Sequence, residues 1–145
     1  MCIRLAARAV IVENGRLLLV NAYPGAQSDL WCCPGGGVAH HTSLRETLVR
    51  EVHEETGLTV EVGAPCLVNE FHDPGGDFHQ VEVFFRCAIT GGALDDAWRD
   101  PENIVTRRRF VTREGMQHLR VKPDSLPRAA FGEAAVYDPL EPIVR

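Results

Sequence analysis

Three glutamates lie within five residues in the segment "REVHEETGL" at positions 50–58: Glu51, Glu54 and Glu55. Like charges at helical spacing repel one another, so a solvated helix end would tolerate this group whereas a bound cation would require it. Carboxylate oxygens are the ligands that hard divalent cations prefer. These three side chains are therefore the first candidates for chemistry in the chain.

The residues on either side of the glutamates predict a helix over 44–56. Ser43 and Glu46, in "SLRE", form a capping box at its start. Gly57 follows the last helical residue and suits the left-handed conformation that often ends a helix. Between these signals an apolar stripe runs along one face, made of Leu44, Leu48, Val49 and Val52.

A helical wheel shows which glutamates face the protein. With roughly 100° per residue, Glu55 falls between Leu44 and Leu48, on the apolar side, and Glu51 falls at its edge. A glutamate turned inward is costly unless it is paired or binds a metal. Arg50 supplies one positive charge, and we expect Mg²⁺, with Mn²⁺ as an alternative, to supply the rest. In the competing interpretation, Glu54 and Glu55 are ordinary solvated residues of a helix displaced by one position.

A run of glycines precedes the helix in "PGGGV" at 34–38, in a segment that is expected to be a loop leading into the helix. Gly35, Gly36 and Gly37 have no side chains, so their backbone groups can approach a ligand closely. A flexible loop without a ligand is the alternative. Together with the helix, these glycines predict bare backbone beside the acidic cluster.

These residues resemble the signature of the Nudix hydrolase (MutT-like) family, G-x5-E-x7-R-E-U-x-E-E-x-G-U, in which U is a bulky aliphatic residue. The match covers residues 36–58, from Gly36 through the unbroken "REVHEETGL". One position departs: Thr42 stands where the family has its first glutamate, which helps to brace the loop against the helix. Thr42 can form hydrogen bonds but offers no carboxylate, so we expect weaker metal binding.

The resemblance implies roles for individual residues. Glu51, Glu54 and Glu55 would hold the metal, with the Gly36 carbonyl as a further ligand, and Arg50 would orient Glu51. A general base would come from the box or from a later loop, "DDAWRDPEN" at 95–103. That loop offers Asp95, Asp96, Asp100 and Glu102, of which we favour Glu102; a solvated acidic turn is the alternative.

The resemblance also implies a reaction: Mg²⁺-dependent hydrolysis of a nucleoside diphosphate linked to another moiety. Because of Thr42, a Nudix-like domain that binds a nucleotide without turning it over is the second hypothesis. The expected fold is α+β, an α/β/α sandwich with a mixed β-sheet between helices, in one domain over 1–145. Many members of the family are dimers, so a homodimer is expected.

The strand pattern is consistent with this fold. Strands are predicted at 3–12, 16–22, 58–71, 78–89 and 104–111, with a short one at 30–33. Asn14-Gly15 is a hairpin signal between the first two. A second helix is expected within 112–119, and the proline-rich tail from 121 is expected to be irregular, with one helical turn near 125–133.

Composition limits the partners. The net charge is −5, with 20 acidic and 15 basic residues, which disfavours an extended nucleic acid but allows a small nucleotide carried with a metal. No apolar run is long enough to span a membrane, and no signal peptide is evident, so we expect a cytoplasmic protein. The five cysteines are an odd number without metal-site spacing and are interpreted as thiols that are mostly buried.

Several residues outside the box could contact a substrate, each with a structural alternative. Trp31 and Phe78 would stack on a base or pack in the core. His72 and His79 would line a cleft or be structural. Arg107 and Arg109 share one face of a predicted strand, where they would contact phosphate or simply be solvated.

Overall fold

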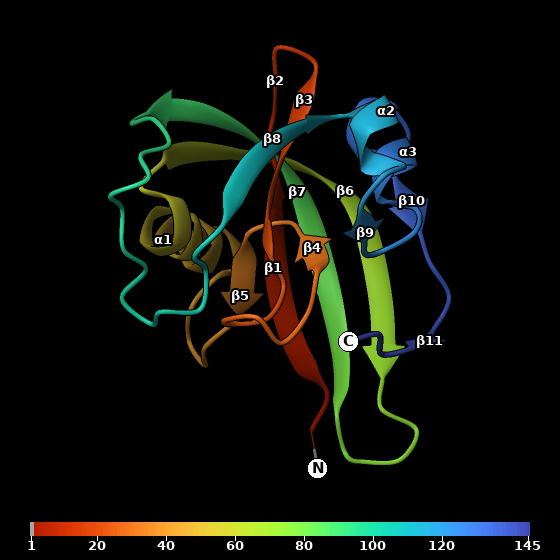
Figure 1. The fold of residues 1–145 in the computed structure, drawn as a ribbon. Helices are drawn as coiled ribbons and strands as arrows, with labels where there is room; N and C mark the ends of the chain where they lie inside the picture. The colour runs from red at the N-terminus through yellow and green to blue at the C-terminus, as the bar shows by residue number, and fades with distance from the viewer. Residues whose placement is uncertain (1) are drawn as a thin grey trace.

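The computed structural model describes residues 2–145, which form two β-sheets and three helices (Figure 1). The strands are β1 (Arg4–Val10), β2 (Val12–Glu13), β3 (Arg16–Asn21), β4 (Leu30–Cys32), β5 (Gly35–Gly37), β6 (Thr59–His72), β7 (His79–Gly91), β8 (Arg108–Thr112), β9 (Arg120–Val121), β10 (Val136–Tyr137) and β11 (Glu141–Pro142). The helices are α1 (Leu44–Thr56), α2 (Arg113–Met116) and α3 (Leu126–Phe131).

The larger sheet is mixed. Its order is β10-β6-β7-β1-β5, and β11 also pairs with β6. The long strands β6 and β7 are antiparallel, whereas β1 lies parallel to β7 and antiparallel to β5. The second sheet has the order β2-β3-β4-β9, and β8 also pairs with β3. This arrangement places β5, the glycine strand, at the edge of the larger sheet next to α1.

The helices lie on opposite sides of the sheets, α1 on one side and α2 with α3 on the other (Figure 1). Two apolar clusters fill the spaces between these layers. One packs Leu48 and Val52 of α1 against β1, β3 and β7. The other packs Leu126 of α3 against Leu17 and Phe84 of the sheets. The result is the predicted α+β sandwich with mixed sheet between helices.

The predicted N-terminal hairpin is only partly formed. Asn14 and Gly15 have φ of 54° and 74°, as the turn signal requires. The antiparallel pairing stops after Val12↔Leu17, because β1 leaves the hairpin for the other sheet. There its alanines are completely buried between α1 and the second sheet.

Two other strand predictions were wrong in extent. The strand expected at 104–111 begins only at Arg108, because the side chain of Asn21 takes the amides of Thr106 and Arg107 that a ladder would otherwise use. The tail from 121 is less irregular than expected, since β10 and β11 extend the larger sheet alongside β6. The helical turn near 125–133 is confirmed as α3.

Three of the cysteines are buried, as expected: Cys33, Cys66 and Cys87. Among the described residues, no helix has both the length and the apolar character needed to cross a lipid bilayer.

Candidate metal and substrate site

Helix α1 has the boundaries that its capping signals predicted. The Ser43 hydroxyl accepts a hydrogen bond from the Glu46 amide at 3.0 Å, and Gly57 has φ of 77° and donates to the His53 carbonyl. These caps fix the rotation of the helix, so Glu51 and Glu54 lie on the face of α1 that is turned toward Glu102. One residue of the predicted apolar stripe does not fit: Val49 is 37% exposed, because it lies at the outer edge of the stripe.

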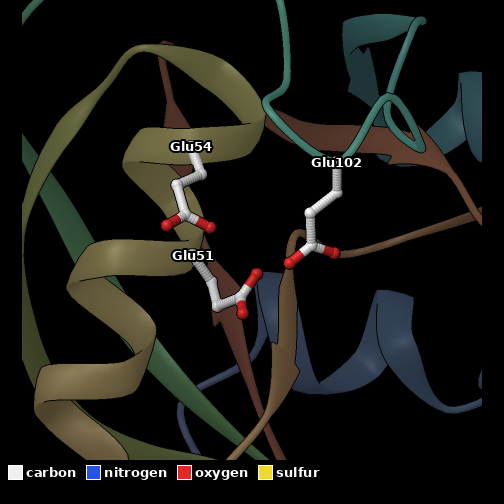
Figure 2. A group of neighbouring side chains, drawn as sticks. All are labelled: Glu51, Glu54 and Glu102. Atoms are coloured by element: carbon white, nitrogen blue, oxygen red, sulfur yellow. The ribbon is translucent and has the colours of Figure 1, made fainter.

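Three carboxylates converge at the end of the cleft (Figure 2). Glu51 and Glu54 come from α1 and Glu102 from the loop before β8, and one oxygen of each lies within 4.8 Å of the others. The Arg50 guanidinium lies near two of them, 3.2 Å from Glu54 and 3.4 Å from Glu51. One exposed arginine cannot neutralise three carboxylates, whereas their oxygens match the ligand preference of a divalent cation. The donor set therefore fits a metal of the Mg²⁺ type.

Glu55 faces inward and is 7% exposed. Its carboxylate accepts from the Gly35 amide at 3.3 Å. Burial raises the pKa of Glu55 well above its usual range; the charge of Glu51 adds to this effect, and Arg8 opposes it. The pKa of Glu51 is also raised, mainly by burial. Glu55 thus lies behind Glu51, outside the three-carboxylate cluster, and its role as a direct metal ligand stays a prediction.

The glycines 35–37 form strand β5 and not the loop that was expected. The backbone at Gly36 comes so close to α1 that a Cβ there would lie 2.7 Å from the carboxyl carbon of Glu51. A Cβ at Gly37 would collide with the Arg4 guanidinium. A side chain at either glycine would thus displace the Glu51 carboxyl group or the Arg4 guanidinium, and the glycines leave the bare backbone that the sequence predicted.

Asp100 holds the loop that carries Glu102. It is 8% exposed and accepts three backbone hydrogen bonds: from Glu102 at 3.0 Å, Ile104 at 3.2 Å and Val105 at 2.8 Å. Asp100 was one of the sequence candidates for a base, but its two oxygens are occupied by these amides. Its position makes it a positioning residue for Glu102.

Two more residues fix the same loop, and neither was among the candidates named from the sequence. Asn21, 2% exposed, donates to the carbonyls of Tyr23 and Ile104 and accepts from the amides of Thr106 and Arg107. Trp98 donates its indole N–H to the Glu54 carbonyl at 2.9 Å and packs over Gly57. A tryptophan within an acidic loop was the one available signal, because such a side chain needs a surface to cover.

Thr42 lies outside the cluster and connects the loop to the helix. Its hydroxyl donates to the Ala39 carbonyl at 2.6 Å and lies 3.2 Å from the hydroxyl of Thr47 in the first turn of α1. A threonine at this position therefore still braces the loop against the helix. It adds no carboxylate to the site.

The remaining sequence candidates lie away from the cluster. Arg107 and Arg109 share a face, as predicted, and both stack on Trp31 at 5.5 and 5.6 Å. The rings of His72 and His79 lie 5.9 Å apart beside the turn that joins β6 and β7.

A cavity of about 460 Å³ opens beside the carboxylates. It brings together predicted site residues from three segments of the chain: Gly35, Gly36, Gly37, Arg50, Glu51, Glu55 and Glu102. Arg4 and Arg8 of β1 also line it and were not anticipated. Acidic groups and arginines in one cavity suit a ligand that carries phosphate together with a metal.

Residues 3–129 match the model of the NUDIX domain. The chain belongs to the Nudix family. It is 30% identical over 95 residues to an ADP-ribose pyrophosphatase of Methanocaldococcus jannaschii, covering 63% of this chain and 56% of that protein. It is also 30% identical over 83 residues to the human protein "Nucleoside diphosphate-linked moiety X motif 6", covering 57% of this chain and 26% of that one.

The fold is likewise that of solved Nudix structures. The crystal structure of a MutT protein from Bacillus halodurans superposes with a TM-score of 0.73 at 18% identity, covering 93% of this chain and 87% of that one. Among the two curated relatives, the matched segment spans about a quarter of the human protein and just over half of the ADP-ribose pyrophosphatase.

Proposed function

We propose that this Nudix protein is a Mg²⁺-dependent pyrophosphohydrolase that acts on a nucleoside diphosphate linked to another moiety, with Mn²⁺ as an alternative ion. The observation that carries the proposal is the convergence of Glu51, Glu54 and Glu102 within 4.8 Å, from segments about 50 residues apart in the chain. The names of two relatives, an ADP-ribose pyrophosphatase and a nucleoside diphosphate-linked moiety X protein, support this substrate class.

In this proposal each acidic residue has a separate role. Glu51 and Glu54 hold the ion, and Glu55 and the Gly36 carbonyl are proposed as further ligands; the Gly36 backbone lies close to the Glu51 carboxyl group. When bound, Mg²⁺ neutralises charge on the diphosphate and makes phosphorus more electrophilic. Arg50 forms ion pairs with both Glu51 and Glu54 and so keeps their carboxylates in the cleft.

Glu102 is proposed as the general base. It reaches the cluster from the opposite side of the cleft to α1 (Figure 2), where its carboxylate can accept a proton from water. The water oxygen forms a bond to one phosphorus, and the bond from that phosphorus to the bridging oxygen breaks. The bridging oxygen leaves with the other phosphate, so the products are two phosphate monoesters and the second proton passes to solvent.

The test is turnover of a nucleotide panel, including ADP-ribose, with Mg²⁺ and with EDTA. We expect metal-dependent release of a nucleoside monophosphate, and a drop in kcat of about 10²-fold or more for Glu102→Gln. Glu51→Gln and Glu54→Gln should weaken Mg²⁺ binding itself, measured by calorimetry. Glu46→Gln, an exposed glutamate in the first turn of the same helix, is the matched control and should behave as wild type.

One other outcome would favour a different function. Because Thr42 replaces a carboxylate of the family signature, the chain could bind nucleotide without hydrolysing it. Binding of a nucleotide with Mg²⁺, but no turnover of any member of the panel, would identify a sensor and overturn the proposed hydrolysis. The cytoplasmic location and the homodimer expected from the sequence and the resemblance remain predictions.

A further inference from the structure

A second cavity of about 390 Å³ adjoins the first. The two share a boundary made by four residues, Arg4, Arg8, Ala22 and Cys32. Glu51, Glu55 and Glu102 line the first cavity and not the second. The second cavity is lined by the ends of β6 and β7 and by residues 141–145. A ligand extending from the carboxylates past the two arginines would enter it.

The walls of the second cavity are largely apolar and aromatic. Phe71 and Phe78 lie with their ring centres 5.6 Å apart on one side, and Tyr23 lies on another. Residues 141–145 form a further wall, held in place because Tyr23 donates to the Val144 carbonyl and the Ile143 amide donates to the His72 carbonyl. Flat apolar walls of this kind suit a planar heterocyclic ring.

Two oxygens on residues that line this cavity have no hydrogen-bond donor among residues 2–145. Asn69, which is 2% exposed, lines the cavity, and its Oδ1 receives no hydrogen bond from any residue between 2 and 145. Glu82 is its direct partner across the sheet and also lines the cavity. The Oε2 of Glu82 accepts from Arg8, while within the described part of the chain Oε1 has no donor.

An unpaired buried acceptor is unfavourable, and native proteins rarely keep one without a reason. The terminal torsion of an asparagine is soft, so Oδ1 can turn toward the cavity that its side chain lines. The protein then offers two neighbouring acceptors, from Asn69 and Glu82, in a cavity that Gln80, Lys122, Glu141 and Arg145 also line. A ligand that fits them must donate two hydrogen bonds from one place.

We propose that the second cavity binds the nucleobase and selects a base with an amino group at C6 of a purine or C4 of a pyrimidine, adenine or cytosine. Such a group carries two N–H donors, one for Oδ1 of Asn69 and one for Oε1 of Glu82. Hypoxanthine and uracil carry a carbonyl oxygen at that position. An oxygen there would face two acceptors and leave both unpaired, so the same site would disfavour these bases.

This inference rests on the proposed function, because it places the diphosphate between the two cavities. Arg4 and Arg8 line both of them, and cations there match the charge of a diphosphate. The base then lies on one side of the arginines, and the bond to be cleaved lies beside the carboxylates on the other.

The first experiment changes only the ligand. Binding of AMP and IMP, and of CMP and UMP, is measured by calorimetry with Mg²⁺ present. We expect the amino-bearing member of each pair to bind at least about tenfold more tightly. Equal affinities within the pairs, or tighter binding of IMP and UMP, would overturn the inference. Since this is a binding measurement, its result stands whether or not the protein hydrolyses any nucleotide.

The second experiment changes the protein. Asn69→Leu replaces the amide with an apolar group of similar size, and we expect the AMP-to-IMP preference to fall to about threefold or less. Mg²⁺ affinity should stay at the wild-type value, because Asn69 lies outside the first cavity. Glu61→Gln, an exposed change on the same strand, should keep the full preference. An unchanged preference in a folded Asn69→Leu protein would contradict the assigned role.

The two proposals fail in different ways. Loss of the amino preference together with Mg²⁺-dependent turnover would remove the base assignment and leave the hydrolase intact. An amino preference without turnover would leave the base assignment intact and indicate a sensor. If Asn69→Leu does not fold, Asn69→Ala and the ligand pairs answer the same question.

Discussion

Substitution of Asp100 provides the sharpest test of how the site is built. Asp100 is linked to the carboxylate cluster by a hydrogen bond from the backbone amide of Glu102. In Asp100→Ala, three amides lose their acceptor. The Val105 amide is buried, so its loss costs about 2 kcal/mol. The other two lie on exposed residues and can turn to water, at about 0.5 kcal/mol each.

The expected destabilisation is therefore about 3 kcal/mol, which a domain of ordinary stability survives. Its effect on the site is larger than this number suggests, because the released loop no longer holds Glu102 near Glu51 and Glu54. Loss of a residue that orients a group of a metal site lowers metal affinity or activity by about 10- to 100-fold. Because Glu102 is proposed as the general base, we expect a fall in kcat within that range for Asp100→Ala, measured by turnover alongside thermal unfolding.

Two controls define the cause. Asp96→Ala removes an exposed carboxylate from the same loop and should leave kcat unchanged; the backbone carbonyl of Asp96, and not its side chain, takes part in a hydrogen bond. Asp100→Asn keeps one of the two acceptor oxygens and should have a kcat between those of wild type and Asp100→Ala. If Asp100 acts through Glu102, adding Glu102→Gln to Asp100→Ala should lower kcat little further. Full additivity of the two changes, or a wild-type kcat in Asp100→Ala, would refute the positioning role.

Three other substitutions have expected outcomes of different kinds. Gly36→Ala should weaken Mg²⁺ binding by about tenfold, because its Cβ would displace the Glu51 carboxyl; Gly75→Ala, whose Cβ meets only ordinary contacts, is the comparison. Without divalent cations, the free energy of unfolding should fall as pH rises above the usual pKa of a glutamate, because the raised pKa of Glu55 makes the folded state hold a proton that the unfolded state releases. Thermal unfolding in EDTA should show this slope in wild type and a flatter one in Glu55→Gln; identical slopes would exclude Glu55 as its source. Thr42→Val should lower the free energy of unfolding by about 1 kcal/mol through loss of its bonds to Ala39 and Thr47, and an unchanged denaturant midpoint would show that the brace is unimportant.

The sequence was sufficient for the parts of the site that depend on local structure. Helix α1 could be predicted to the residue because its two ends carry strong local signals, Ser43 and Gly57. The inward orientation of Glu55 followed from the same register and is confirmed by its burial. The glycines beside Glu51 were expected to leave bare backbone, and only their assignment to a loop was wrong.

The parts that depend on distant contacts were not accessible in this way. Glu102 could be named as a candidate, but nothing local places it within reach of α1. Its position depends on Asp100, Asn21 and Trp98, whose partners lie up to 86 residues away in the chain. The departure of β1 from its hairpin has the same origin, since a parallel partner such as β7 leaves no signal in the strand itself.

The two ends of the long cleft come from different stretches of chain. In the proposed function, cleavage depends on residues from β5, α1 and the loop before β8, while one side of the adjoining compartment is supplied by residues 141–145, which contribute nothing to the carboxylate group. Exchanging residues 141–145 is therefore a route by which the proposed choice of nucleotide could be re-engineered while the carboxylate group is left unaltered.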